Sequence, residues 1–249
     1  MARTALSRRL TWLLTEVSGK RRETDRATTV RLLSDEWPGH LAGQHVDVRL
    51  TAEDGYQTQR SYSIASAPRP GSLELTVEEI ADGEVSPYLV EELREGDRLE
   101  LRGPIGGYFT WTATDNGPLL LIAGGSGVVP LMSMLRYRSQ IGSDVPVTLL
   151  YSARDWNDVI YRDELEQLGH LPGVHILFTL TRAQPANWTG YRRRIDRAMI
   201  EEIGASVGAD PRVFICGPTP LVESVASTMV SLGYPPQRVK TERFGPTGG

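Results

Sequence analysis

The sequence predicts an antiparallel β-barrel followed by a doubly wound parallel sheet, that is, a β domain joined to an α/β domain. Residues 26–102 form a succession of short strand-like runs separated by turn residues. From residue 119 onward, strand-like and helix-like patterns alternate. A glycine-rich turn at 124–127, near the midpoint of the 249 residues, favours two domains. The expected domains are residues 1–112, with 1–25 as an N-terminal extension, and residues 113–249.

The first half contains runs of Val, Thr, Leu and Ile separated by clusters of turn residues. Antiparallel strands at this spacing favour a small closed barrel. One helix is expected among them, because Ser86 is a good N-cap and Pro87 suits the first helical position. The expected strands are 28–33, 44–50, 59–64, 73–80 and 98–101.

The second half begins after a glycine-containing loop at 103–111 and a polar stretch at 112–117, which together mark a domain boundary. The alternation that follows predicts parallel strands joined by helices, with ligands at the carboxyl ends of the strands. The expected strands are 119–123, 146–151, 174–180, 212–215 and 237–242, and the expected helices are 128–140, 160–168, 195–204 and 218–232.

Composition excludes several classes of protein. The net charge is -4, whereas binding to nucleic-acid phosphates needs a basic face. No apolar run approaches the roughly 20 residues of a membrane-spanning helix. The short apolar run at 10–14 lacks the length and the cleavage site of a signal peptide. We therefore expect a cytoplasmic protein with no membrane span, and we take a monomer as the expected oligomeric state.

Cys216 is the only cysteine, so the chain can form no internal disulfide. It also cannot supply the roughly four thiolates of an iron–sulfur cluster, so any cluster must belong to a partner. The four histidines show no metal-ligand spacing, and no metal site is expected. Two groups of basic residues, within 3–26 and 192–197, are interpreted as solvated loops.

The stretch from Pro118 to Arg136 predicts a buried strand, a tight turn and a helix. Glycines at 124, 125 and 127 would let a pyrophosphate approach the backbone, where the start of the following helix offers free N–H groups. Pro130 falls in the first helical turn, where a missing N–H costs little. The alternative is a turn without a ligand.

A second candidate site is the strand end from Arg60 to Ser66. Alternation along a strand points Arg60 and Tyr62 to one face and Ser63 to the other. The first face thus offers a guanidinium for a pyrophosphate and a ring for stacking. Taken alone, the motif also fits an exposed strand end with a surface Tyr–Arg pair.

These motifs together resemble the ferredoxin–NADP reductase family. RSYS, GEVS at 83–86, GPIGGYF, GGSGVVP, CGP and an aromatic residue near the C-terminus occur in the order and spacing of that family, over residues 26 to 246. The chain is most similar to the reductase halves of bacterial oxygenase electron-transfer chains. Relatives of these often carry a plant-type [2Fe–2S] domain, which we do not expect in this chain.

The resemblance implies an FAD site in the first domain. Arg60 would contact the pyrophosphate, Tyr62 would lie along the flavin, and the Ser63 hydroxyl would lie near the reactive flavin nitrogen N5. Val85 and Ser86 would provide a second contact, to phosphate at the start of a helix. The resemblance also implies FAD contacts at Ile64, Val77 and Glu79.

The resemblance further implies a nicotinamide-nucleotide site in the second domain. The residues of the nucleotide turn are Gly125, Ser126, Gly127 and Pro130, and those that place the nicotinamide beside the flavin are Cys216, Gly217 and Pro218. Phe244 would cover the other face of the flavin, and its alternative is an anchor for the last strand. Ser63, Cys216 and Glu242 are the candidate catalytic residues, and the alternative for Cys216 is a buried core residue.

The end of the second strand of the α/β domain bears on the choice between NADPH and NADH. Ser152 and Arg154 suit the 2′-phosphate of NADPH. Tyr161 and Arg162 lie where several NADPH users carry a tyrosine and a basic residue. Asp155 is a complication, since a carboxylate near the phosphate would be unfavourable. NADPH is expected, with NADH as the alternative.

The function implied is that of a flavoenzyme. NAD(P)H would give a hydride to FAD, and the electrons would pass singly to a separate ferredoxin-type protein or oxygenase. A diffusible acceptor such as free flavin, a quinone or oxygen is the first alternative. The second is an electron-transfer subunit of a larger complex, although the known subunits of that kind carry a cysteine-rich cluster site that one cysteine cannot form.

Overall fold

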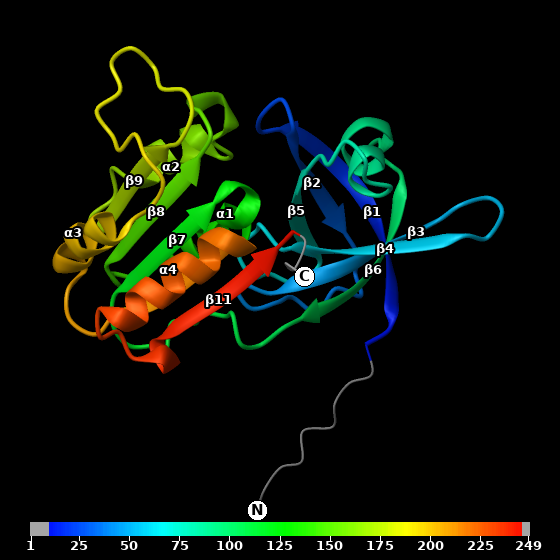
Figure 1. The fold of residues 1–249 in the computed structure, drawn as a ribbon. Helices are drawn as coiled ribbons and strands as arrows, with labels where there is room; N and C mark the ends of the chain where they lie inside the picture. Colours follow the sequence, from blue (N-terminus) through cyan, green and yellow to red (C-terminus); the bar gives the residue numbers. More distant parts are fainter. Residues whose placement is uncertain (1–9, 246–249) are drawn as a thin grey trace, which may run out of the picture.

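The computed structural model describes residues 10–245, which form two sheets side by side (Figure 1). The first sheet is antiparallel, with the strand order β4-β3-β6-β1-β2-β5. Its strands are β1 (Trp12–Arg22), β2 (Ala27–Leu33), β3 (His45–Thr51), β4 (Gln57–Ser63), β5 (Ser72–Glu78) and β6 (Arg98–Ile105). A bridge between Ile64, just after β4, and Leu75 of β5 joins the two edge strands and closes the barrel. The predicted antiparallel barrel is confirmed.

β1 lies where we expected an N-terminal extension. It occupies the middle of the sheet, paired with β2 and β6. Its charged residues hid the strand pattern, but they lie on the outer side while Thr15 and Val17 are buried. Lys20, for example, donates to the carbonyls of Val90 and Leu93 at 2.8 and 2.9 Å. The basic residues at 3, 8 and 9 lie outside the described residues.

The helix expected after Ser86 is shorter than the sequence suggested. It is a single π-helical turn, η1 (Tyr88–Glu92), and Pro87 occupies its N-cap. The Ser86 hydroxyl accepts a hydrogen bond from the N–H of Ile80 at 3.0 Å, so it closes the preceding loop instead of capping the helix. Leu89 and Leu93 still pack into the barrel core, as the apolar face predicted.

The second sheet is parallel and has the strand order β11-β10-β7-β8-β9. Its strands are β7 (Leu119–Gly124), β8 (Val147–Ala153), β9 (Val174–Leu180), β10 (Arg212–Pro218) and β11 (Val239–Phe244). The helices are α1 (Val128–Gln140), α2 (Arg162–Leu168), α3 (Arg197–Val207) and α4 (Thr219–Ser231). Every strand and helix expected in this half is present, so the predicted doubly wound α/β architecture is confirmed.

The two faces of the parallel sheet are covered differently. α3 and α4 bury one face in an aliphatic cluster around Ile122 and Leu150. α1 and α2 cover the other face, and the cluster beneath α1 continues into Phe109 and Trp111 of the loop after β6 and into the barrel residues Ala27 and Ala65. α1 therefore lies between the parallel sheet and the barrel (Figure 1). This shared core holds the two sheets together.

The strand order places a topological switch point between β7 and β10. The chain runs from β7 outward to β8 and β9, then returns to β10 on the other side of β7. Loops at the carboxyl ends of β7 and β10 therefore lead to opposite faces, which leaves a crevice between them. This end of the sheet is directed toward the barrel, as the arrowhead of β11 shows (Figure 1).

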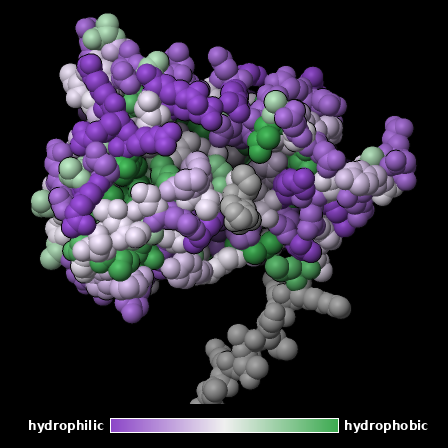
Figure 2. Space-filling model, viewed as in Figure 1, coloured by the Kyte–Doolittle hydropathy of each residue, from purple (hydrophilic) through white to green (hydrophobic). Residues whose placement is uncertain are grey.

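No helix within residues 10–245 is both long and apolar enough to cross a bilayer. On the face shown in Figure 2, hydrophobic residues form small separate patches in a largely hydrophilic surface.

Candidate functional site

A cavity of about 710 Å³ lies between the barrel and the carboxyl ends of the parallel strands. The barrel contributes the end of β4 and the segment 78–80, and the second sheet contributes the ends of β7, β8 and β10. The cavity therefore gathers residues from both halves of the chain. The site residues predicted from the sequence that line it are Tyr62, Ser63, Glu79, Gly125, Ser126, Ser152, Arg154, Pro218 and Phe244.

The end of β4 forms the barrel wall of the cavity. In the register with β3, Arg60 lies opposite Val48 and Tyr62 lies opposite Val46. Because cross-strand partners share a face of the sheet, Arg60 and Tyr62 lie on one face, as the alternation predicted. Burial raises the pKa of Tyr62 to about 12, so its hydroxyl keeps its proton at neutral pH.

Arg60 is exposed and lies beside the 83–86 turn. Its guanidinium donates to the adjacent carbonyl of Gln59 at 2.7 Å. Thr58, two residues before Arg60 on the same face, donates to Glu84 at 3.2 Å, which fixes the turn next to β4. An exposed guanidinium on the strand that contacts this turn has further N–H donors to offer a phosphate group.

Four of the expected FAD contacts have buried side chains. Ile64, Val77 and Val85 are at most 1% exposed and pack inside the barrel. Their side chains serve the core, so only their backbone atoms are positioned for a cofactor. Ser86 is also buried, and its hydroxyl oxygen is occupied by the N–H of Ile80.

The glycine-rich turn after β7 has two separate physical requirements. Gly125 has φ +54° and faces the cavity, so this position needs a residue that tolerates a left-handed backbone next to open space. A Cβ at Gly127 would collide with the backbone carbonyl of Cys216. Gly127 thus permits the close packing of the β7 turn against the end of β10, rather than a ligand contact. Pro130 is buried in the first turn of α1.

The CGP segment, residues 216–218, packs against the glycine-rich turn from the end of β10. A Cβ at Gly217 would lie 3.1 Å from the backbone nitrogen of Gly124. Cys216 is 2% exposed, and burial raises the pKa of its thiol well above the usual value. Cys216 is therefore a neutral thiol behind the cavity wall, while Pro218 reaches the cavity itself.

Glu242 joins this end of the sheet to the barrel. It lies opposite Cys216 in the β10–β11 pair. Its Oε1 is 3.9 Å from Nδ1 of His45, and His45 is the cross-strand partner of Ser63. Burial raises the pKa of Glu242 to about 7, and its buried Oε2 has no hydrogen-bond partner among the described residues. The three candidate catalytic residues thus lie on adjoining elements, with His45 between Ser63 and Glu242.

Phe244 ends β11 opposite Pro218 and lines the cavity. It is 39% exposed, which a hydrophobic anchor of the strand would not be. An exposed aromatic ring at the mouth of a cavity can cover a planar ligand. The segment 246–249 that follows it lies outside the described residues.

The end of β8 carries the residues expected to select the nucleotide. Ser152 and Arg154 both line the cavity. Asp155, the expected complication, turns its carboxylate into its own turn and accepts from the N–H groups of Asn157 and Asp158 at 2.8 and 3.3 Å. That carboxylate is therefore engaged by backbone donors and does not line the cavity.

Two expected nucleotide contacts lie elsewhere. Arg162 pairs with Asp163 at 3.3 Å and lies over the ring of Trp156, outside the cavity wall. Tyr161 is buried at 2% exposure, and its hydroxyl donates to Thr76 of the barrel. Tyr161 has a left-handed backbone at φ 59°. Neither of these two expected contacts lines the cavity.

Some cavity residues were not identified from the sequence. Arg194, from the group interpreted as a solvated loop, reaches the cavity from the long loop between β9 and α3, yellow in Figure 1. Arg26, Glu78 and Asp158 also line the cavity. Burial, together with nearby Asp155, raises the pKa of Asp158. No local pattern marks these residues, because they meet only through the packing of the two sheets.

The cavity fits an elongated flavin nucleotide with a second nucleotide against it. The barrel side offers Tyr62 and Ser63 for the ring system, and the sheet side offers the open turn at Gly125. Arg60, exposed two residues before Tyr62, lies outside the cavity wall. FAD bound here would accept a hydride from a nicotinamide and release electrons one at a time. The chain's own residues orient the two groups, and Glu242 can hold or release a proton near neutral pH at its buried carboxyl.

A barrel and a doubly wound sheet that share a cavity at the switch point define a class of two-nucleotide oxidoreductases. The model of the oxidoreductase FAD-binding domain matches residues 26–110, and that of the oxidoreductase NAD-binding domain matches residues 121–227. The chain belongs to the ferredoxin–NADP reductase-like family of FAD- and NAD-binding oxidoreductases. Its two halves match the FAD-binding and NAD-binding domains of oxidoreductases.

Two relatives illustrate the range of the family. Ferredoxin–NADP reductase B of Sorangium cellulosum is 39% identical over 82% of this chain and 84% of its own length. The glycine betaine monooxygenase reductase subunit of Pseudomonas aeruginosa is 34% identical over 82% of this chain. The match covers 56% of that subunit, so this chain spans little more than half of it.

Solved structures share the fold. A cytochrome P450 reductase from Amycolatopsis superposes with a TM-score of 0.81 at 26% identity, covering 96% of this chain and 71% of that one. The ferredoxin NADP⁺ reductase of Neisseria gonorrhoeae, with bound FAD and NADP, has a TM-score of 0.80 at 22% identity, covering 93% of this chain and 98% of that one.

Proposed function

We propose that this protein takes a hydride from NADPH onto FAD and delivers the electrons singly to a separate iron–sulfur protein or oxygenase component. The observation that carries the proposal is the cavity lined by Tyr62 and Ser63 on one side and by Gly125 and Ser126 on the other. One wall suits a flavin and the other suits a nicotinamide nucleotide.

The relatives support the class of acceptor. Their printed names include a ferredoxin–NADP reductase, a reductase subunit of glycine betaine monooxygenase and the phenol hydroxylase P5 protein. The first name pairs the reductase with ferredoxin, the second describes a reductase subunit of an oxygenase, and the third names a protein of phenol hydroxylase. Cys216 is the only cysteine in these 249 residues, so they cannot supply the roughly four thiolates of an iron–sulfur centre.

Steady-state assays with different acceptors test this proposal. NADPH oxidation would be followed with a plant-type [2Fe–2S] ferredoxin, with free FMN and with a soluble quinone. We expect kcat/KM for the ferredoxin to exceed that for the small acceptors by at least about tenfold, since a docking surface adds specificity. Equal or higher kcat/KM for free flavin or quinone would instead favour a reductase with a diffusible acceptor.

NADPH is proposed over NADH on the charges at the end of β8. Arg154 and Arg194 both line the cavity, and Ser152 adds a hydroxyl. The two cations suit a dianionic 2′-phosphate. The competing carboxylate of Asp155 is turned into its own backbone turn, where it accepts from the N–H of Asn157.

Kinetics with both nucleotides test this preference. Loss of one charge-assisted hydrogen bond costs about 1.5–3 kcal/mol, so Arg154→Ala should lower kcat/KM for NADPH by about 10- to 100-fold and leave that for NADH nearly unchanged. Arg194→Ala should act in the same direction. Arg162→Ala is the matched control, because Arg162 lies outside the cavity. A wild type that prefers NADH, or an NADPH preference that survives Arg154→Ala, would refute the assignment.

A further inference from the structure

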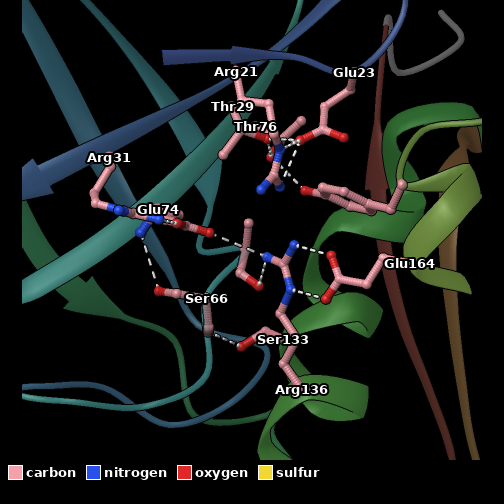
Figure 3. A network of polar contacts seen from close by, with 12 residues as sticks. Arg21, Glu23, Thr29, Arg31, Ser66, Glu74, Thr76, Ser133, Arg136 and Glu164 are labelled. Atoms are coloured by element: carbon pink, nitrogen blue, oxygen red, sulfur yellow. Dashed lines mark hydrogen bonds and ion pairs between the residues drawn. The ribbon is translucent and has the colours of Figure 1, made fainter. Parts of the chain in front are cut away.

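A buried polar cluster connects α1 and α2 to the barrel (Figure 3). Its centre is Arg136, whose side chain is 13% exposed. The guanidinium donates to both carboxylate oxygens of Glu164 in α2, at 2.8 and 2.6 Å. It also donates to the carbonyl of Ala65 at 2.9 Å. One side chain thus joins α1, α2 and the segment just after β4.

Glu74 of β5 completes the charge balance around Arg136. Its Oε2 lies 3.4 Å from the guanidinium, and its Oε1 pairs with Arg31 at 2.9 Å. Burial by itself would lower the pKa of Arg136, but the hydrogen bonds with Glu164 and the neighbouring negative charges raise it, so the group stays charged. Removal of either carboxylate would leave a buried charge partly unpaired, which is costly.

Tyr161 forms a second link across the same contact. Its ring lies 4.8 Å from the guanidinium carbon of Arg136, and its hydroxyl donates to Thr76 of β5. Thr76 in turn shares a hydrogen bond with Thr29 at 2.7 Å. The left-handed backbone of Tyr161 is unfavourable for a bulky residue and persists only where the surroundings hold it. In this protein, the hydrogen bond to Thr76 of the barrel stabilises the backbone conformation of Tyr161.

The cluster adjoins both the strand end that is expected to contact the flavin and the helix that follows the nucleotide turn. Ala65 and Ser66 follow directly after Ser63 and Ile64, and Ser133 of α1 donates to the carbonyl of Ser66 at 2.7 Å. α1 itself begins immediately after the glycine-rich turn that lines the cavity. The side chain of Thr76 also lines the cavity. A shift of α1 against the 64–66 segment would therefore change the distance between the flavin side and the nicotinamide side.

We propose that Arg136 and Tyr161 are positioning residues that fix the separation of the two nucleotides for hydride transfer. The proposal rests on the NAD(P)H-to-FAD reaction of the family and assigns a role to residues outside the cavity wall. A displacement of about 1 Å between reacting groups can cost on the order of 100-fold in rate. The bidentate pair with Glu164 and the hydrogen bond to the carbonyl of Ala65 fix the direction of the Arg136 guanidinium relative to both α2 and the barrel.

Three substitutions separate this role from a general effect on folding. Arg136→Met removes the buried charge, Arg136→Lys keeps the charge without the bidentate geometry, and Tyr161→Phe removes only the hydroxyl. Arg138→Met is the matched control. Arg138 is a buried arginine on the same helix, but it donates to the carbonyls of Val145 and Pro172 within the α/β half and not to the barrel.

The primary readout is transient kinetics with NADPH and its deuterated form. We expect Arg136→Met to slow hydride transfer by about 10- to 100-fold and to make the isotope effect more temperature-dependent, as a longer donor–acceptor distance does. Arg136→Lys should recover part of the rate, and Tyr161→Phe should show a smaller change of the same kind. FAD content and the rate of oxidation by ferricyanide should remain those of the wild type.

A second readout needs no cofactor. In FAD-free protein, hydrogen exchange of the amides at 64–66 and in α1 should become faster in Arg136→Met and in Tyr161→Phe, and should stay unchanged in Arg138→Met at 64–66. If Arg136→Met does not fold, Tyr161→Phe carries the test. The proposal would be overturned by variants in which these amides exchange faster while hydride transfer stays within about twofold of wild type and the isotope effect is unchanged. Failure of the wild type to accept a hydride at all would instead contradict the family activity.

Discussion

Glu242 shows how burial sets the chemistry of a single residue in this protein. Its carboxyl is near the end of the last strand, 3.9 Å from His45, and one oxygen has no partner among the residues described. Burial raises its pKa from 4.5 to about 7. The carboxyl is therefore poised to hold or release a proton near neutral pH, next to the strand end that carries Ser63.

The same shift makes stability depend on pH. A folded-state pKa above that of the unfolded chain means that the folded protein binds the proton more tightly, so the stabilisation is fully present below about pH 4.5. It is lost as the pH rises through about 7, and the difference amounts to about 3 kcal/mol. We predict that Glu242→Gln flattens the fall in the free energy of unfolding between pH 5 and pH 8, measured by urea denaturation.

Glu223→Gln serves as the control for this prediction, because Glu223 is an exposed carboxylate, 60% exposed and paired with Arg243. It should retain the pH dependence of the wild type. An unchanged slope in Glu242→Gln would show that the Glu242 carboxyl titrates normally.

Cys216 combines burial with a position behind the cavity wall. Its thiol is neutral, because burial raises its pKa, and its carbonyl packs against Gly127. We predict that Cys216→Ala lowers the rate of hydride transfer while FAD content stays near that of the wild type, as expected for a residue that shapes the nicotinamide side. The check is single-turnover reduction alongside thermal unfolding. Parallel loss of FAD and of Tm would assign Cys216 to the core alone.

At the scale of elements, the glycine-rich turn illustrates a requirement that the sequence motif alone does not reveal. Gly127 is needed because the carbonyl of Cys216 occupies the space of a Cβ. We predict that Gly127→Ala destabilises the protein by about 1–3 kcal/mol, the usual cost of overpacking, and weakens nucleotide binding by moving the turn. Gly107→Ala is the control, since a Cβ there would meet nothing within 4 Å. Equal stability of the two variants would contradict this packing.

The helices and strands that could be predicted from the sequence are those with the clearest hydrophobic patterns. The strands and helices after residue 119 were all anticipated, because buried parallel strands are continuous apolar runs that alternate with helices. β1 was missed because it ends in the consecutive charged residues Lys20, Arg21 and Arg22, which obscure the alternation. The π-helical turn η1 was anticipated only as a longer helix, since its end is set by packing on the barrel rather than by a local stop signal.

At the scale of the whole molecule, the site depends on contacts between the two sheets. Tyr62, Gly125 and Arg154 could be proposed from motifs, because each lies on an element whose pattern is local. Arg194 and Arg26 could not, since they reach the cavity from loops distant in the sequence. Arg162 lies outside the cavity wall, and the hydrogen bond from Tyr161 beside it to Thr76 of the barrel could not be seen in the sequence.

The measurement that tests the central claim most directly is anaerobic mixing of the purified protein with NADPH while the flavin absorbance is recorded. We expect a yellow protein that releases about one FAD per chain on denaturation and contains no iron, and whose flavin band is bleached by a single equivalent of NADPH. The reduced protein should then transfer its electrons to an added [2Fe–2S] ferredoxin. A colourless protein that does not take up FAD, a protein that holds FMN, or a bound flavin that neither NADPH nor NADH reduces would contradict the claim.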